Sequence, residues 1–520
     1  MAAFRPDDPA LTRRELLLAG GAAATTTIAL GALNPAQTAA AKRLAREAAL
    51  PAGTFPSGVA SGQPFEHGIT LWTRVGDVER SGRLRLEIAR DADFARVVHR
   101  QDVRAAAVRD HTARARVLQP RVLEPGEQYF YRFATRSTSS PVGRFRTALP
   151  ADSREPVRIG FFSCQNWRAG YYNAHAGLAA EPDLDLVVSL GDYMYETCGA
   201  SAVPGRDDRT SSGENNQTET LADYRAKYRL YRSDPNLQAV HANHPFVAIW
   251  DDHEFENDQE GPKGEGTTAV RRIPYAERRR NAYLGFFENM PLQRIGSDRD
   301  RIYRKLRLGA NADLFLLDTR TYREPDNSTI LGAAQKQWLK AGLERSRAAW
   351  KVLGNQVMLM SLDVPTGNPV NPDAWDGYEA ERREVVQHVL DKGIRDVTVI
   401  TGDIHTFFAG TVTTTGRTGG RPGMTEFVGG SITSDSLDGD LGGEDARPIT
   451  EPVFQAAQLL NPHYAFANFN RRGYGVMECR PGELTVDFKA VDSVRRRDRP
   501  VTTLASFRVE AGSTAVQRTR

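Results

Sequence analysis

From Val157 onward, short apolar runs alternate with helical patterns, and this alternation constrains the fold more than any other feature of the sequence. The apolar runs predict strands over residues 157–162, 184–190, 244–250, 312–317, 350–359 and 396–401. Between them, apolar residues recur at helical spacing over residues 220–231, 275–287, 334–346 and 379–390. Strands that alternate with helices build a sheet covered by helices, so residues 155–508 are predicted to form one α/β domain.

Four of the predicted strands end in residues that bind metals in proteins. These residues are Cys164 after the first strand, Asp192 and Tyr195 after the second, Asp252 and His253 after the third, and Asp403 and His405 after the last. Each one alone indicates little, because an Asp after Gly is commonly a turn or cap residue and a single His or Cys is usually structural. Ligands of α/β sheets gather beyond the carboxyl ends of the strands, so the four endings together predict a metal centre.

The types of ligand predict which metals are bound. Thiolate, imidazole and phenolate groups suit a transition metal, whereas carboxylates suit hard cations such as calcium, magnesium or manganese. We therefore predict iron held by Cys164, Tyr195, His405 and a shared Asp192, with one or more hard cations held by Asp192, Asp252 and Asp403. Such a centre clamps a phosphoryl group, activates a bound water and stabilises the charge of the transition state.

Two further residues are candidates for contact with a substrate. His253 is predicted to lie beside the metals, where it would contact phosphate or protonate a leaving alkoxide; the alternative is a structural histidine. Arg168 would meet a phosphate oxygen, or else lie on the surface. The sequence contains no Gly-x-Ser-x-Gly elbow, no P-loop and no Gly-x-Gly-x-x-Gly after a strand, so a metal-assisted reaction is favoured.

The acidic segment IWDDHEFEND, residues 249–258, contains more charge than the metal centre needs. Beyond Asp252 and His253, we expect Asp251 and Glu254 to orient the turn. Glu256 and Asp258 are expected to be solvated loop charges, and Arg278 to Arg280 are expected to be a solvated basic cluster.

The residues before the α/β domain show two other kinds of pattern. Residues 54–149 alternate apolar and polar residues between Gly and Pro signals, which predicts a small antiparallel β-sandwich of the immunoglobulin or fibronectin kind. Residues 42–53 are predicted to be a linker.

Residues 1–41 are predicted to be a cleaved export signal. Arg13 and Arg14 precede a mild apolar stretch that ends in small residues, and adjacent arginines in this place resemble a bacterial twin-arginine signal. We therefore expect the twin-arginine translocation machinery as a partner, no membrane span after cleavage, and a periplasmic, cell-wall-associated or extracellular location.

Composition excludes some classes of partner. The content of 40% hydrophobic residues is typical of a globular protein. The formal net charge of +3 is close to balanced and gives no reason to expect nucleic acid as a partner. Cys164, Cys198 and Cys479 are too few for a disulfide framework in a chain of this size.

The motifs in their order resemble the PhoD-type alkaline phosphatases of the calcineurin-like metallophosphoesterase superfamily. The resemblance is carried by FPSGVASGQP, ITLWTRV, FFSCQN, LVVSLGDYMYE, AIWDDHE, WKVLGNQVM and TGDIH. It implies a four-layer α/β/β/α catalytic domain and a mixed centre of Fe(III) and Ca²⁺. By motif, Cys164, Asp192, Tyr195, Asp403 and His405 would be iron-side or bridging ligands, and the acidic Asp252 would favour calcium.

We accordingly predict an exported, metal-dependent alkaline phosphatase and phosphodiesterase that hydrolyses phosphate esters by attack of a metal-bound oxygen. The resemblance implies phosphate scavenging as its setting. A dedicated phosphodiesterase or phospholipase D is an alternative, because these enzymes would share the metals and the phosphate contacts, and the sequence of the loops does not show which leaving group they accept. A secreted, non-catalytic binding module with a structural metal site is the alternative of another class.

Overall fold

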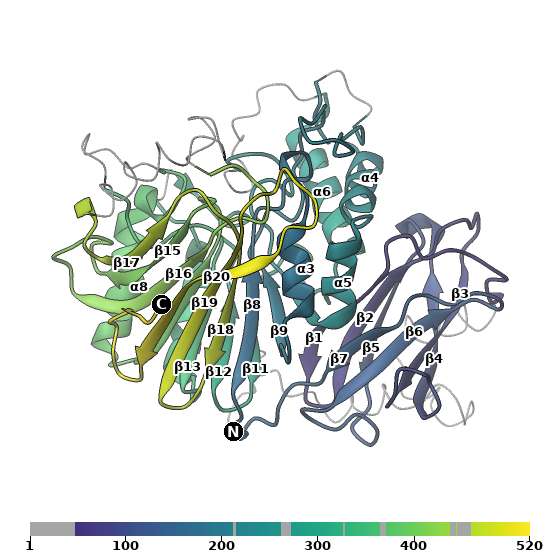
Figure 1. Cartoon of the computed structure of the whole chain (residues 1–520), viewed down its shortest axis with the longest axis horizontal. Coiled ribbons are helices and arrows are strands. Elements are labelled where there is room, and N and C mark those ends of the chain that lie inside the picture. The colour runs from purple at the N-terminus through teal and green to yellow at the C-terminus, as the bar shows by residue number, and fades with distance from the viewer. Residues whose placement is uncertain are drawn as a thin grey trace.

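The computed structural model describes residues 47–211, 215–259, 261, 272–325, 328–363, 371–436, 444 and 459–520. The predicted export signal and residues 42–46 of the predicted linker lie outside these residues. Two large sheets and one small sheet organise the described chain (Figure 1).

The first sheet has ten strands in the order β21-β20-β19-β18-β8-β9-β10-β1-β2-β5. Its centre is the parallel set β8, β9 and β10, whose carboxyl ends lie at one edge. The strands are β1 (Val59–Phe65), β2 (Gly68–Arg74), β5 (Thr112–Leu118), β8 (Val157–Phe162), β9 (Leu186–Ser189), β10 (Pro245–Ala248), β18 (Arg472–Cys479), β19 (Glu483–Val491), β20 (Val501–Glu510) and β21 (Gln517–Arg518).

The second sheet has seven strands in the order β11-β12-β13-β14-β16-β15-β17. Its parallel part comprises β12, β13, β14 and β16. The strands are β11 (Arg304–Leu308), β12 (Ala312–Leu316), β13 (Trp350–Gly354), β14 (Val397–Thr401), β15 (Phe407–Thr413), β16 (Pro422–Gly429) and β17 (Tyr464–Asn468).

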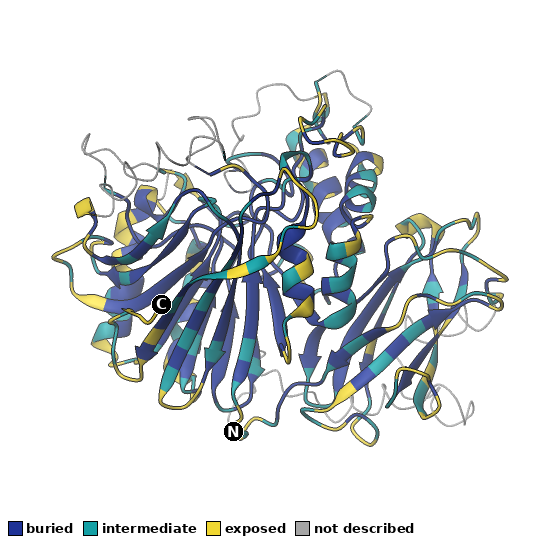
Figure 2. Ribbon diagram, viewed as in Figure 1, coloured by how far each residue is buried: buried dark blue, intermediate teal, exposed yellow. Residues whose placement is uncertain are grey.

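The two large sheets pack face to face and are covered by helices on their outer faces. Phe407 of the second sheet and Phe488 of the first have ring centroids 4.9 Å apart, within a continuous buried core (Figure 2). Helices α3 (Asn173–Ala180), α4 (Leu221–Tyr231), α5 (Pro235–Asn243) and α6 (Tyr275–Asn289) cover the first sheet. Helices α7 (Gly332–Arg345) and α8 (Glu379–Asp391) cover the second. The predicted α/β/β/α arrangement is confirmed.

Local sequence explains where these helices begin. The Thr220 side chain accepts the Asp223 N–H at 3.2 Å and the Asp223 carboxylate accepts the Thr220 N–H at 3.0 Å, a capping box that starts α4. Asp234 caps α5, with Pro235 in the first helical position. The sequence did not predict α3 or α5, because buried polar residues such as His175 and His241 obscure their periodicity.

The segment before the α/β domain folds as a two-sheet sandwich. Strands β1, β2 and β5 face a four-stranded sheet of β4 (Val97–Ala105), β3 (Gly82–Ala89), β6 (Gln128–Ala134) and β7 (Gly143–Arg146) across a core of their own. Every pairing between these strands is antiparallel. The predicted antiparallel β-domain is therefore confirmed.

The sandwich shares a sheet with the α/β domain, which the sequence did not predict. Strand β1 pairs in parallel with β10, with Ser61 opposite Pro245 and Gly62 opposite Phe246. A Cβ at Gly62 would lie 2.3 Å from the Phe246 carbonyl oxygen, so only glycine permits this approach. Strand β10 thus has a partner on each side, β9 and β1.

None of the helices in the described part of the chain has the length and apolar character needed to cross a membrane. Cys164, Cys198 and Cys479 are buried and form no disulfide bond with one another. This agrees with the prediction that three cysteines do not make a disulfide framework.

Candidate metal centre

The ends of five strands meet at one edge of the two sheets. The segments after β8, β9, β10 and β14 carry the predicted ligands, and the segment after β12 carries Arg320. Cys164, Asp192, Asp403 and His405 all have positive φ, between 53° and 67°. Such conformations cost roughly 1 kcal/mol or more for a residue other than glycine, and they cluster at functional sites.

A glycine brings the segments after β9 and β10 together. Gly191 has a φ of 120°, and a Cβ there would lie 2.5 Å from the Asp251 Cβ. Because Gly191 has no side chain, the two segments can lie close together, which brings Asp192 near Asp252.

The first group of donors contains the predicted iron ligands. Donor atoms of Cys164, Asp192 and His405 all lie within 4.8 Å of one another. The Tyr195 hydroxyl lies 2.9 Å from Asp192 Oδ2 and 3.2 Å from His405 Nε2. Ser434 Oγ lies 2.7 Å from the same hydroxyl. Thiol, imidazole, phenol and carboxyl groups from three separate strand ends therefore converge.

Asp192 also belongs to a second group, with Asp252 and His253, whose donor atoms again lie within 4.8 Å of one another. One carboxylate shared by two groups is in the position of a bridging ligand. Both Asp252 oxygens accept backbone N–H groups, from His253 at 2.9 Å and from Asp258 at 2.7 Å, so this carboxylate is fixed in place.

A third group consists of Asp252, Asp258 and Asp373. Asp258 is only half-buried, but it belongs to this group and is not simply a solvated loop charge. The sequence did not indicate Asp373, because no predicted strand ends directly before it. The predicted ligand Asp403 is in none of the three groups; its Oδ2 accepts a hydrogen bond from Asn371 at 2.9 Å and its Oδ1 lies 3.8 Å from Arg320.

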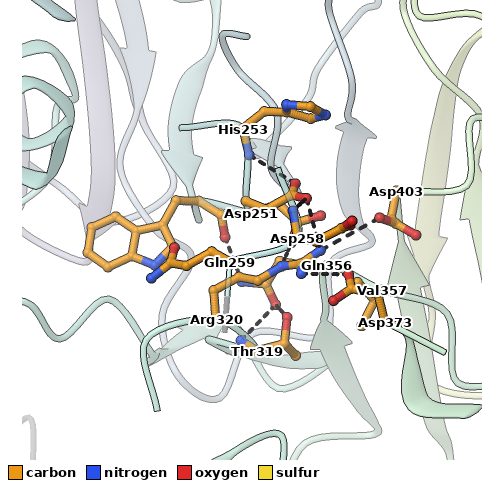
Figure 3. Close-up of polar contacts among 12 residues, drawn as sticks. Asp251, His253, Asp258, Gln259, Thr319, Arg320, Gln356, Val357, Asp373 and Asp403 are labelled. Atoms are coloured by element: carbon orange, nitrogen blue, oxygen red, sulfur yellow. Dashed lines mark hydrogen bonds and ion pairs between the residues drawn. The ribbon is translucent and has the colours of Figure 1, made fainter. Parts of the chain in front are cut away.

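Arg320 lies between the carboxylates (Figure 3). Its Nε donates to Asp251 and its Nη1 lies 2.5 Å from Asp373, while its Nη2 is 3.6 Å from Asp252. The guanidinium side chain is 0% exposed. The sequence carried a signal for it, since Arg320 follows a predicted strand whose end reaches the same edge.

The charge at the site fits bound cations. Burial and the nearby Asp192 charge raise the pKa of the Cys164 thiol and of the Tyr195 hydroxyl, and burial with the Asp252 charge raises the pKa of Asp192 itself. Among the described residues, the buried Asp192 Oδ1 has no hydrogen-bond partner. Bound metal ions would stabilise the ionised forms that burial and neighbouring carboxylates disfavour, and they would give the unpartnered oxygen a partner.

The two histidines differ in electrostatic character. Burial lowers the pKa of His405 to about 4, which keeps it neutral as a ligand must be. Burial also opposes charge on His253, but Glu196 and Asp252 outweigh it and hold the His253 pKa well above its usual value. Glu196 Oε2 lies 2.6 Å from His253 Nδ1, and the Tyr195 ring packs against the imidazole at 4.1 Å between centroids.

Glu254 holds the ligand-bearing loops together. Its carboxylate accepts backbone N–H groups from Asp192 at 3.0 Å, Tyr193 at 2.6 Å and Asp251 at 2.9 Å. This agrees with the orienting role expected for Glu254. Asp251 likewise contacts Arg320.

Two expectations from the sequence were wrong. Glu256 and Arg278 were expected to be solvated, but both side chains are 0% exposed and form an ion pair at 2.7 Å. Each charge is buried because the other compensates it. Arg168 donates to the Thr197 hydroxyl at 2.8 Å and belongs to none of the three donor groups, so its contact with phosphate stays a prediction.

Replacing Glu254 with Gln should disrupt the loops without changing the predicted ligands. A Gln side chain keeps only one acceptor oxygen, and leaving a buried N–H group without a partner costs about 1–3 kcal/mol. We expect a lower thermal unfolding midpoint and weaker retention of metal, measured by calorimetry and by metal analysis after dialysis. The matched control is Glu277→Gln on the exposed face of α6, which should change neither quantity. Equal behaviour of the two variants would show that Glu254 does not position the loops.

Comparisons with known proteins agree with this geometry. The PhoD-like phosphatase family matches residues 159–488, and the PhoD-like phosphatase N-terminal domain matches residues 38–149. The chain is 33% identical to alkaline phosphatase D of Bacillus subtilis over 496 residues, 89% of this chain and 82% of the relative.

Solved structures give the same result. A structure of PhoD superposes with a TM-score of 0.79 at 30% identity, covering 90% of this chain and 92% of that one. Purple acid phosphatase PPD1 from yellow lupin seeds shares the fold, with a TM-score of 0.53 at 12% identity and coverage of 88% and 74%. The chain is thus a homologue of alkaline phosphatase D, a phosphoric ester hydrolase, and it belongs to the PhoD-like phosphatase family.

Proposed function

We propose that the chain is an exported, metal-dependent alkaline phosphatase with phosphodiesterase activity, used to release phosphate from extracellular esters. The observation that carries the proposal is the position of Asp192, shared between a thiol, imidazole and phenol group on one side and a carboxylate group on the other. The family match and the similarity to alkaline phosphatase D support the reaction class.

Cys164, Tyr195, His405 and Asp192 would hold Fe(III), while Asp192 and Asp252 would hold Ca²⁺. Soft and phenolic donors favour the transition metal, and two carboxylates favour the hard cation. When bound, such cations act as Lewis acids that polarise a phosphoryl group and activate water.

His253 would bind the phosphoryl group or protonate the leaving group. Glu196 engages its Nδ1, so Nε2 is the nitrogen that remains for substrate. A protonated imidazole suits both tasks, since it neutralises phosphate charge and holds a proton to donate.

The main rival is a dedicated phosphodiesterase or phospholipase D, because the same metals and the same phosphoryl contacts serve monoesters and diesters. A non-catalytic binding module is the rival of another class. The raised pKa of His253 beside the donor groups favours catalysis, because a purely structural metal site has no need of a histidine with a perturbed pKa.

Hydrolysis of three substrates by the purified protein separates these functions. We expect turnover of an aryl phosphate monoester and of a bis-aryl diester, with less turnover of phosphatidylcholine. Asp192→Asn should lower kcat/KM by about 10²–10³-fold, the scale of losing one group that stabilises the transition state. Asp152→Asn, an exposed carboxylate outside the site, is the matched control. Diester turnover without monoester turnover would favour the rival enzyme, and no turnover by metal-replete protein would favour the binding module.

Metal content and colour test the assignment of the cations. The purified protein should contain iron and calcium and show a visible tyrosinate-to-iron absorption band, since Tyr195 lies among the iron donors. Tyr195→Phe should lose the band, whereas Tyr129→Phe, in strand β6 of the sandwich, should keep it. Stoichiometric zinc in a colourless protein would contradict the iron assignment.

Export through the twin-arginine route is a proposal that rests on Arg13 and Arg14. We expect the variant Arg13→Lys/Arg14→Lys to accumulate inside a bacterial host that exports the unchanged chain. Immunoblots of the culture medium, the cell wall or periplasm, and the cytoplasm would measure this. The control is Arg43→Lys/Arg46→Lys beyond the apolar stretch, which should be exported normally. Normal export of the first variant would exclude this route.

A further inference from the structure

The positively charged side chain of Arg320 is buried among the carboxylates of the candidate metal centre. Four carboxylates surround it, with oxygens in direct contact or within 3.8 Å: Asp251, Asp252, Asp373 and Asp403. A guanidinium buried in this way is stable only when charges of opposite sign compensate its lost hydration. The same carboxylates would otherwise attract a metal ion.

The guanidinium has a fixed position. The Asp318 carboxylate accepts the Arg320 backbone N–H at 3.1 Å, and the preceding Thr319 hydroxyl donates to Gln356 at 3.0 Å. Asp373 contacts both Arg320 and Arg323. The side chain, which follows β12, therefore lies among Asp251, Asp373 and Asp403 (Figure 3).

One nitrogen of Arg320 is aimed at the donor groups. Its Nη2 has no hydrogen-bond partner among the described residues and lies 3.6 Å from Asp252 Oδ2. Asp252 is also a member of the Asp252, Asp258 and Asp373 group. Arg320 thus places positive charge on two of the three carboxylates that could form a separate cation site.

We propose that Arg320 is a built-in counter-cation that replaces a metal ion at the Asp252, Asp258 and Asp373 group and so limits the number of hard cations that the centre binds. The inference rests on the proposed function only in assuming that the centre binds cations. Hard cations would bind at the Asp192 and Asp252 position, whereas Asp373 neutralises arginines. Arg320 is thus a positioning residue that sets the metal complement.

Calcium titration of the iron-loaded, full-length protein, after calcium has been removed with a chelator, tests this inference. Removing the charge of Arg320 while keeping much of its volume, as Arg320→Met, should add one calcium site, or tighten calcium binding by about tenfold or more, because affinity follows ligand charge. Arg320→Lys keeps the charge and should bind the same number of ions as the unchanged protein. Unchanged number and affinity in Arg320→Met would overturn the proposal.

A second pair of variants tests the same idea with the arginine in place. Asp373→Asn should keep the full number of calcium ions, because Asp373 faces arginines, while Asp252→Asn should lose one. Loss of a calcium ion in Asp373→Asn would show that Asp373 is a metal ligand, and would overturn the proposal even if Arg320→Met fails to fold. In the double variant Arg320→Met/Asp373→Asn, the additional site should disappear.

Binding is measured without any substrate, so this inference and the proposed function fail separately. The expected calcium pattern in a protein that hydrolyses no phosphate ester would uphold the role of Arg320 and exclude the phosphatase. The reverse result, hydrolysis with an additional calcium ion bound at Asp373 in the unchanged protein, would exclude only the role of Arg320.

Discussion

Negative charge buried at the carboxyl ends of the strands is the constraint on which the rest of the site depends. Asp192, Asp252 and Asp403 lie within a few residues of three strand ends. Asp192 and Asp252 are buried and Asp403 is partly buried, which removes much of the hydration that would stabilise their charges. Some of that charge is compensated by protein groups, namely Arg320 and His253, whose pKa is raised by Glu196 and Asp252. The remainder, with the Cys164 thiol, requires metal ions if these groups are to ionise.

The sheets stabilise the strained backbone conformations at the same edge. Each of the four predicted ligands with positive φ follows closely on a central strand, and those strands are held on both sides by neighbours. Glu254 adds three backbone hydrogen bonds across two of the loops. A rigid scaffold of this kind can hold strained ligands in one arrangement before a metal binds, which reduces the cost of binding.

The sequence predicted the parts of the site that follow directly from a strand. Apolar runs locate β8, β9, β10 and β14, and the polar residues after them could be placed at one edge without knowledge of the structure. Arg320 follows a predicted strand too, but its role could not be predicted from that position alone, because the carboxylates around it come from other segments of the chain. Asp373 had no local signal, because only the tertiary fold brings its segment to the site. The burial of Glu256 escaped prediction for the same reason, since its partner Arg278 lies on α6.

The N-terminal sandwich is best understood as part of the support of the metal centre. Strand β10, which leads into Asp252 and His253, pairs with β9 on one side and with β1 of the sandwich on the other. Trp72 of β2 donates to the Glu288 carbonyl at 2.7 Å, and Arg232 packs over its ring at 4.5 Å. Without β1, the strand that precedes Asp252 would be an edge strand with unpaired backbone groups. The position of Asp252 relative to Asp192 therefore depends on contacts that the sandwich makes away from the candidate metal centre.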